Sequence, residues 1–275
     1  MTRSFLRHIA CMLGIHVMGL LMLSVMRLAL YVAGHHLLAP SSSGEIWLQA
    51  QAFVHGVWFD NVIGCYILIV PLVLTSIVHL MGRPHLALKA NLLWMRLLWL
   101  IAIAISACNI PYFLYFSKNI NSSIWNWTEY GTTTLGMLLG EQSYYPIMAG
   151  YLLTAILFVY LTIKVRRHFS LSQTGKPNNP NMKAVWPKRL ADMLGVLIVT
   201  CISVGLCLLG IRGRTGYNPI KVSAAYYCHD TFLNQLGINP SFNLLSTTLD
   251  DRRPENRQLN LMPVDEARQE CITQM

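Results

Sequence analysis

The stretch "IACMLGIHVMGLLMLSVMRLALYVA" (residues 9–33) holds one charged side chain, Arg27, in an otherwise apolar run. An α-helix needs roughly 20 such residues to cross the hydrocarbon core of a bilayer. Lipid offers no hydrogen-bond partners to backbone N–H and C=O groups, so a spanning run of this kind has to be helical. The stretch therefore predicts a transmembrane helix. It is too long for the apolar region of a cleaved signal peptide, and we expect it to be retained.

Four later apolar runs have similar lengths, at residues 62–80, 97–116, 146–163 and 193–211. The composition agrees with them, because 54% of the 275 residues are apolar and only 12% are charged. Soluble domains carry about a quarter charged residues. The sequence predicts an all-α polytopic membrane protein with five transmembrane helices.

Basic residues fall in alternate connections. Residues 34–61 contain no Lys or Arg and residues 117–145 contain only Lys118, whereas the other connections are basic. Because Lys and Arg are retained on the cytoplasmic side, we expect a cytoplasmic N-terminus and an extracytoplasmic C-terminus in the plasma or inner cell membrane. The net charge of +9 then reflects contact with membrane lipids, and no nucleic-acid partner is expected.

Two opposite charges occur at similar predicted depth. Arg27 lies in the outer part of the first helix, and Asp60 lies near the start of the second apolar region, which begins at Ala52. A pair of opposite charges relieves the desolvation that either charge alone would suffer. We expect Arg27 and Asp60 to form an interhelical charge pair, and the alternative is a site for an anionic lipid headgroup.

Other polar residues indicate no cofactor. His16 and His79 could in principle ligate a haem, but their predicted depths in antiparallel helices do not match. Five of the seven cysteines fall inside the apolar runs without metal-ligand spacing, which leaves Cys228 and Cys271 as a possible disulfide. Since no internal repeat is visible either, a small transporter is a minor alternative.

The segment "RGRTGYNPIKVSAAYYCHDTFLNQLGINPSFNLL" (residues 212–245) follows the last apolar run. Asp230 or Thr231 can cap one short helix, which Gly237 would end, and Asn239 with Pro240 can begin a second. We expect two short interfacial helices outside the membrane. The second would have an apolar face, and two arginines could contact headgroups; these residues are Phe242, Leu245 and Leu249, with Arg212 and Arg214.

The phrases "GIRGR", "NPIKVSAAYY" and "FLNQLGINPSFNLL" (within residues 210–245) together resemble the juxtamembrane segment of the lipoteichoic acid synthase-like family. The phrase "HGVWFDNVIGCYI" (residues 55–67) is similar to the start of that family's second helix. Its members are membrane-anchored phosphoglycerol and phosphoethanolamine transferases of the sulfatase and alkaline phosphatase superfamily. The resemblance implies five helices with the C-terminus outside the membrane, followed by an α/β catalytic domain that holds a divalent metal such as Mn or Mg.

The family's catalytic motif has no counterpart in "STTLDDRRPENRQLNLMPVDEARQECITQM" (residues 246–275). The resemblance therefore assigns no catalytic residue or metal ligand to this chain, and whether the chain is an enzyme stays open. We expect a transmembrane domain at 1–211 and a juxtamembrane linker at 212–275, with the sulfatase-like domain absent through truncation, gene splitting or a frameshift. Such a module would act with a separate catalytic domain and be inactive alone. The competing interpretation is a stand-alone binding or assembly protein of the cell envelope.

Overall fold

The computed structural model describes residues 2–83, 85–169 and 186–253, and within these ranges every regular element is helical. Five helices are long and apolar enough to cross a membrane. They are α1 (Thr2–Ala33), α3 (Ile46–Leu80), α4 (His85–Phe116), α6 (Tyr145–His168) and α7 (Trp186–Arg212). The chain is thus an all-α polytopic membrane protein, which confirms the predicted fold class.

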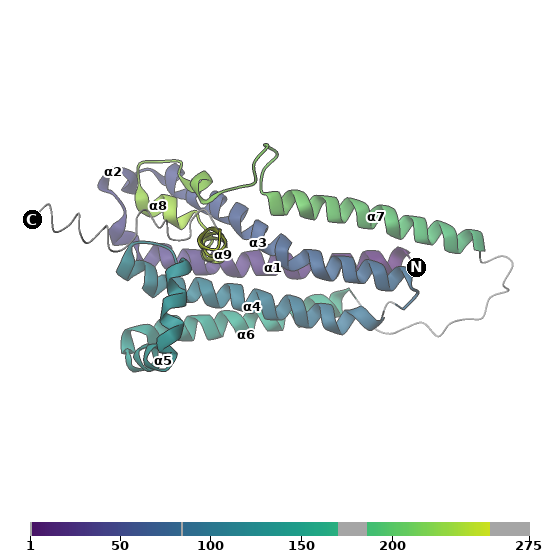
Figure 1. The fold of residues 1–275 in the computed structure, drawn as a ribbon, viewed down its shortest axis with the longest axis horizontal. Helices are drawn as coiled ribbons and strands as arrows, with labels where there is room; N and C mark the ends of the chain where they lie inside the picture. The colour runs from purple at the N-terminus through teal and green to yellow at the C-terminus, as the bar shows by residue number, and fades with distance from the viewer. Residues whose placement is uncertain (1, 84, 170–185, 254–275) are drawn as a thin grey trace, which may run out of the picture.

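Helix α3 holds the bundle together, since it packs against α1, α4 and α7. Helix α1 also contacts α4 and α6, so α1, α3, α4 and α6 form the body of the bundle and α7 lies along one side (Figure 1). The core between them is built from large fully buried side chains, among them Phe5, Phe59, Trp99 and Phe158. Gly19 makes room for Trp99, because a Cβ at Gly19 would lie 2.3 Å from the indole ring.

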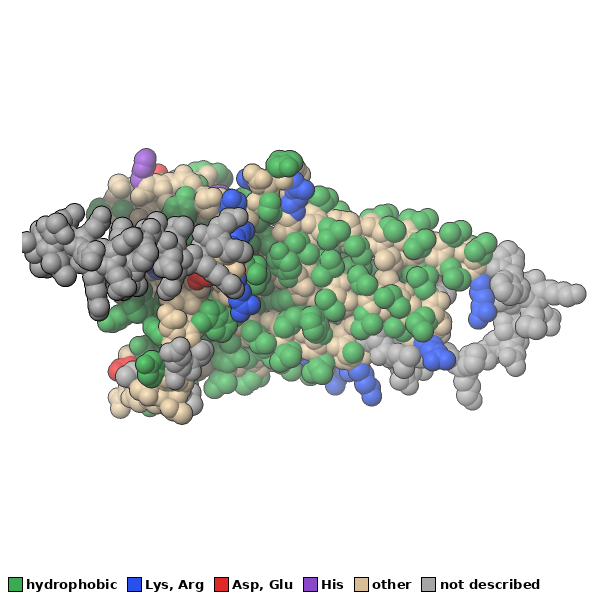
Figure 2. Space-filling model, in the orientation of Figure 1, with side chains coloured by type: hydrophobic (Ala, Val, Ile, Leu, Met, Phe, Trp, Pro, Cys, Tyr) green, Lys and Arg blue, Asp and Glu red, His purple; other side chains and the backbone are tan. Residues whose placement is uncertain are grey.

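The surface of the long helices is apolar. Figure 2 shows hydrophobic side chains over the middle of the molecule and Lys and Arg mostly nearer its ends. Exposed large residues include Ile156 on α6 and Leu206 on α7, at 67% and 64% exposure. A soluble protein would not expose a continuous surface of this kind, and acyl chains are the solvent that suits it.

Helix α3 continues through Pro71, which lacks the N–H that would bond the carbonyl of Ile67. Trp94 of α4 supplies the missing donor, with Nε1 located 3.1 Å from the Ile67 oxygen. The proline therefore adds a contact between α3 and α4 without leaving a buried acceptor unpaired. Helix α3 also begins at Ile46, earlier than the apolar pattern indicated.

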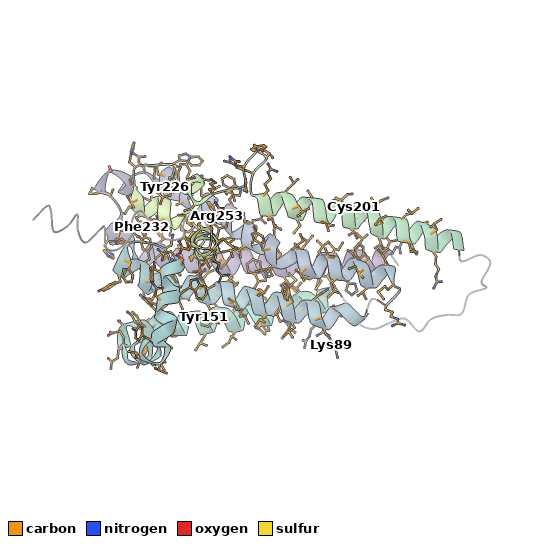
Figure 3. The ribbon with its side chains drawn as sticks, viewed as in Figure 1. Lys89, Tyr151, Cys201, Tyr226, Phe232 and Arg253 are labelled. Atoms are coloured by element: carbon orange, nitrogen blue, oxygen red, sulfur yellow. The ribbon has the colours of Figure 1, made fainter. Side chains whose placement is uncertain are left out.

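The short elements gather at one end of the bundle, opposite the N-terminus (Figure 1). They are η1 (His35–Leu37), α2 (Pro40–Ser43), η2 (Ser122–Tyr130), α5 (Gly131–Gly140), η3 (Gln142–Tyr144), η5 (Val222–Ala225), α8 (Thr231–Leu236) and α9 (Pro240–Asp251). Residues 213–253, which we call the collar, contribute η5, α8 and α9. Tyr226, Phe232 and Arg253 mark the collar in Figure 3. Cys271 and the rest of residues 254–275 lie outside the described residues.

Candidate functional site

Arg27 of α1 and Asp60 of α3 form a two-point ion pair. Nη1 of Arg27 lies 2.8 Å from Oδ2 of Asp60, and Nη2 lies 2.7 Å from Oδ1. The two side chains are 5% and 0% exposed, respectively. A bidentate pair of this kind is the strongest geometry that the two groups can adopt, and burial removes the screening that weakens surface pairs. The pair joins the two central helices.

Gly56 provides the space for the guanidinium group. It lies one helical turn before Asp60 on α3, and a Cβ at this position would be 2.2 Å from Cζ of Arg27. Any larger residue would push the guanidinium group away from its carboxylate partner. The phrase from Gly56 to Asp60 is therefore one structural unit, with a small residue and a carboxylate on the same face of the helix.

The collar covers this ion pair. Nε of Arg27 donates a 3.1 Å hydrogen bond to the carbonyl of Leu236, at the end of α8. Asn239 donates from Nδ2 to Oδ1 of Asp60 at 2.6 Å, and its own Oδ1 accepts from the N–H of Phe242 at 3.0 Å. Asn239 thus caps α9 with its amide oxygen and binds Asp60 with its amide nitrogen. A headgroup could reach Arg27 only after displacing these collar contacts.

Asp230 has a similar double role at the start of α8. Oδ1 accepts from the N–H of Leu233 at 3.1 Å, which is the predicted cap, and Oδ2 accepts from the N–H of Ala39 at 3.0 Å. Ala39 belongs to the connection between α1 and α3. The cap therefore ties the collar to that connection as well as starting its own helix.

The connection after α4 reaches the collar through a row of amides. Asn109 of α4 donates to Oδ1 of Asn119 at 2.8 Å, and Asn119 donates to the carbonyl of Gln235 at the same distance. Asn243 of α9 donates to the carbonyl of Ile120 at 2.9 Å. These amide side chains satisfy loop carbonyls and one another in a buried setting, where unpaired groups would be costly.

The predicted apolar face of α9 is only partly correct. Phe242 is buried and packs against Phe59, but Leu245 and Leu249 are 41% and 54% exposed. The inward side of α9 instead presents Asn243 and Thr247, because the surface beneath it consists of backbone groups at Ile120 and Ser122. Polar partners on that surface determine which face of the helix turns inward.

A further contact secures the collar to the N-terminal part of α3. Tyr227 donates its hydroxyl hydrogen to the carbonyl of Leu48 at 2.6 Å, and its ring stacks on His55 with the centroids 4.8 Å apart. Burial raises the pKa of Tyr227 above the ordinary tyrosine value, and nearby Cys228 and Asp230 act in the same direction. The neutral phenol, which can donate, is therefore the form that the fold favours.

Arg212 and Arg214 do not join this site. Arg212 donates to the carbonyls of Gly216 and Tyr217, and Arg214 donates from Nε to that of Asn218 at 2.6 Å. Both side chains are exposed and hold the turn that follows α7. They remain available at a surface, but the described hydrogen bonds do not connect them to Arg27 and Asp60.

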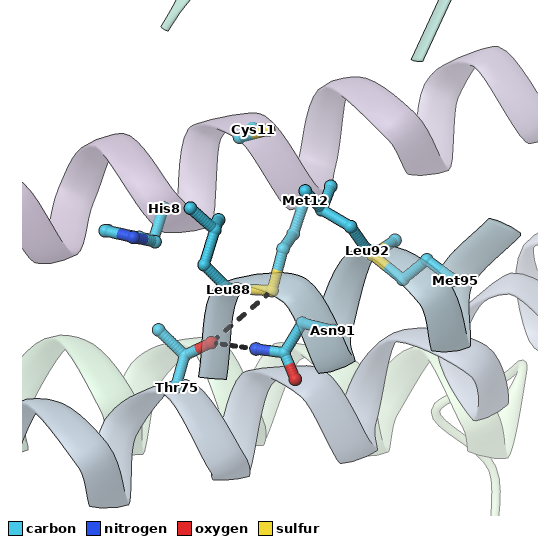
Figure 4. Close-up of a pocket in the computed structure, with 8 residues that line it drawn as sticks. All are labelled: His8, Cys11, Met12, Thr75, Leu88, Asn91, Leu92 and Met95. Atoms are coloured by element: carbon cyan, nitrogen blue, oxygen red, sulfur yellow. Dashed lines mark hydrogen bonds between the residues drawn. The ribbon is translucent and has the colours of Figure 1, made fainter. Parts of the chain in front are cut away.

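A second polar cluster lies nearer the N-terminal end, between α1, α3 and α4 (Figure 4). Asn91 donates to the Thr75 hydroxyl at 2.6 Å and to the carbonyl of Pro71 at 3.2 Å, and Thr75 points its hydroxyl toward the sulfur of Met12 at 3.8 Å. These bonds stay among the helices, and the remaining lining is largely apolar. The cluster therefore holds helices together.

The histidines considered as haem ligands have separate neighbours. His16 pairs with Asn61 at 3.1 Å and meets the edge of Trp99, whereas the His79 ring lies against Phe5 and His8. Within the described ranges, no three His, Cys, Asp or Glu side chains are grouped so that they could hold a metal ion. Cys228 contacts Asn234, with Sγ 3.4 Å from Oδ1, while its proposed partner Cys271 lies outside those ranges.

Comparison with family models, with curated proteins and with solved structures gave no match to this chain. The candidate site is therefore defined by its own geometry. Sequence patterns indicated Arg27, Asp60 and the cap at Asn239, but not that Asn239 reaches Asp60. Gly56 and the amide row through Asn109 were also missed as parts of this site, because their partners are distant in sequence.

Proposed function

We propose that this chain is the membrane anchor and docking module of a lipoteichoic acid synthase-like transferase, which acts on lipid phosphodiesters in cell-envelope synthesis. The observation that carries the proposal is the attachment of the collar to the bundle through Arg27, Asp60 and Asn239. A flexible tether would not need buried, charge-assisted bonds. An anchor that positions a domain against the membrane surface would need such bonds, because the attachment has to fix the orientation of that domain.

The proposed arrangement has the N-terminus in the cytoplasm and the collar outside the plasma or inner membrane. The alternation of basic and non-basic connections supports this orientation. Under the proposal, a sulfatase-like domain supplies the metal and the nucleophile, either as a separate chain or on the same chain beyond the collar. In the proposal, the bundle and collar anchor and present that domain, and Arg212 and Arg214 contact headgroups of the outer leaflet.

A second function deserves a test because Leu245 and Leu249 are exposed on α9. An exposed apolar pair on a firmly held helix suits a protein partner, so the chain could serve as an assembly protein for another envelope enzyme. In both proposals the collar is the docking surface. It holds a sulfatase-like domain in the first proposal and another envelope enzyme in the second.

Two experiments separate these proposals. Sequencing the source DNA across and beyond the codon for Met275 supports the transferase module if a sulfatase-like domain is encoded nearby, and contradicts it if none is encoded. Purified chain in phosphatidylglycerol vesicles should then raise glycerophosphate transfer by that domain, and Asp60→Asn should lower this stimulation. Unchanged transfer with and without the chain would leave the assembly protein as the better account.

A further inference from the structure

Two arginines lie on adjacent helices toward the bundle end opposite the collar. Arg96 is on α4 and Arg166 is near the end of α6, and these two helices pack against each other. Nε of Arg96 donates to the hydroxyl of Thr162 on α6 at 3.0 Å. Thr162 lies one turn before Arg166, so it shares a face of α6 with that residue. Arg96 and Arg166 therefore lie on neighbouring surfaces of α4 and α6, and we call them the arginine pair.

The positive charge of the arginine pair has no counter-charge in the described part of the chain. The ion pairs found among the described residues join Arg27 with Asp60 and Arg253 with Asp250, and neither includes Arg96 or Arg166. Nη2 of Arg96 is buried and has no hydrogen-bond partner among the described residues, and the like charge of Arg166 lies close enough to repel it. Two neighbouring cations, one of them partly buried, raise the free energy of the fold unless an anion neutralises them.

The surroundings of the arginine pair suit a lipid. Leu93, which shares a face of α4 with Arg96, is 68% exposed, and Ile163 shares a face of α6 with Arg166 and is 37% exposed. Ile163 lies about one turn nearer the bundle centre than Arg166, whereas Leu93 lies about one turn nearer the start of α4 than Arg96. Lys89 lies about two turns nearer the start of α4 than Arg96 and points away from the bundle (Figure 3). Cations toward this end of the bundle, with the exposed Ile163 side chain above Arg166, match the layout of a phospholipid.

We propose that Arg96 and Arg166 bind the phosphodiester of an anionic phospholipid in the leaflet at this end, with Lys89 adding charge at the headgroup. Basic pockets between transmembrane helices commonly hold anionic headgroups, and guanidinium groups match phosphate geometry. The hydrogen bond that fixes Arg96 on Thr162 distinguishes the arginine pair from a general basic surface. The inference does not rest on the proposed transferase role. In the orientation proposed above, the leaflet is the cytoplasmic one.

The test is retention of lipid by the purified full chain, measured by native mass spectrometry. The chain is incubated in detergent with phosphatidylglycerol or phosphatidylcholine at equal concentration. We expect phosphatidylglycerol to be retained preferentially, and Arg166→Gln to weaken its binding about fivefold, as expected for one cation near a headgroup. This variant keeps the bond between Arg96 and Thr162, so it tests binding without removing that helix contact. Arg96→Gln should weaken binding at least as much.

Arg167→Gln is the matched control, because it removes an equal charge from the adjacent position on a different side of α6. Its binding should stay within twofold of the unmodified chain. Equal losses in Arg166→Gln and Arg167→Gln, or equal retention of the two lipids, would overturn the site. Glycerol phosphate distinguishes a lipid site from a simple phosphate site. Displacement of the lipid by an equal concentration of glycerol phosphate would also contradict the proposal.

Discussion

Asn239 donates a 2.6 Å hydrogen bond to the Asp60 carboxylate, although the two residues are 179 positions apart. The same amide caps α9 through the N–H of Phe242, and the same carboxylate holds Arg27. One contact therefore connects the first two long helices to the collar beyond the last one. Losing Arg27, Asp60 or Asn239 should therefore weaken both the packing of the first two long helices and the attachment of the collar.

Removing the charge of Asp60 should destabilise the bundle strongly. Asp60→Asn leaves Arg27 buried without a counter-charge, and breaking a buried pair in this way costs about 3 to 5 kcal/mol. The free energy of unfolding, measured in mild detergent, should fall by that amount. Exchanging the two residues, as Arg27→Asp with Asp60→Arg, should recover only part of the loss. The exchange restores the charges but not the bonds to Leu236 and Asn239.

The exchange also separates the structural role from headgroup binding. If the double variant is no more stable than the worse single variant, the ion pair is not the main source of the effect. A headgroup site at Arg27 would then have to be considered again.

Gly56→Ala should disturb Arg27 without touching any charge. The added methyl group would lie 2.2 Å from Cζ of Arg27, so the guanidinium group or the helix has to shift. We expect a loss of about 1 to 3 kcal/mol, the usual cost of overpacking. Gly150→Ala is the control, since nothing lies within 4 Å of its added Cβ. It should be neutral or slightly stabilising, and an equal loss in both variants would contradict the steric argument.

Asn239→Ala should loosen the collar more than a simple loss of a helix cap. A cap contributes about 1 kcal/mol, and a hydrogen bond to a charged group contributes about 1.5 to 3 kcal/mol. Asn239→Ser keeps a capping oxygen but cannot reach across as the amide does, so it should be intermediate. The rate of limited proteolysis within residues 231–251 should rise from the unmodified chain to Asn239→Ser and then to Asn239→Ala. Identical cleavage rates for the two variants would mean that the cap contributes nothing, and a rate for Asn239→Ser equal to that of the unmodified chain would mean that only the cap matters.

Tyr227 should make the attachment of the collar sensitive to high pH. Its pKa is raised in the fold, so its contribution to stability is complete below the ordinary tyrosine pKa of about 10 and falls as the pH rises through the folded value. Proteolysis of the collar should accelerate above about pH 10. Tyr227→Phe should remove that part of the pH dependence while weakening attachment at neutral pH. A pH profile that Tyr227→Phe leaves unchanged would assign the effect to other groups.

The orientation of the chain can be tested with reporter fusions. Alkaline phosphatase fused after Arg253 should be active and a fluorescent protein at that position dark, because the collar is expected outside the cytoplasm. Fusions after Phe169 should give the reverse result. The same reporter active at both positions would contradict the alternating charge argument.

The sequence was sufficient for the parts of the fold that depend on local pattern. Apolar length predicted all five long helices, and cap chemistry predicted the starts of α8 and α9 at Asp230 and Asn239. The pairing of Arg27 with Asp60 could be expected because both lie at similar depth on consecutive helices.

Contacts between distant segments could not be read in this way. Nothing near Asn239 shows that its second amide group points to Asp60, and the exposure of Leu245 depends on polar groups at Ile120 and Ser122. The early start of α3 at Ile46 also depends on packing against the collar, where Tyr227 binds the Leu48 carbonyl. An apolar pattern records burial in lipid but not burial under another part of the protein.

Hydrogen exchange of the collar in lipid nanodiscs tests the central claim most directly. The account predicts that backbone amides in residues 231–251 are protected in the unmodified chain, because the collar is held on the ion pair. Asp60→Asn should lower that protection in α8 and α9, while amides in the middle of α6 keep theirs. Fast exchange in the unmodified collar, or equal protection with and without the Asp60 carboxylate, would contradict the account.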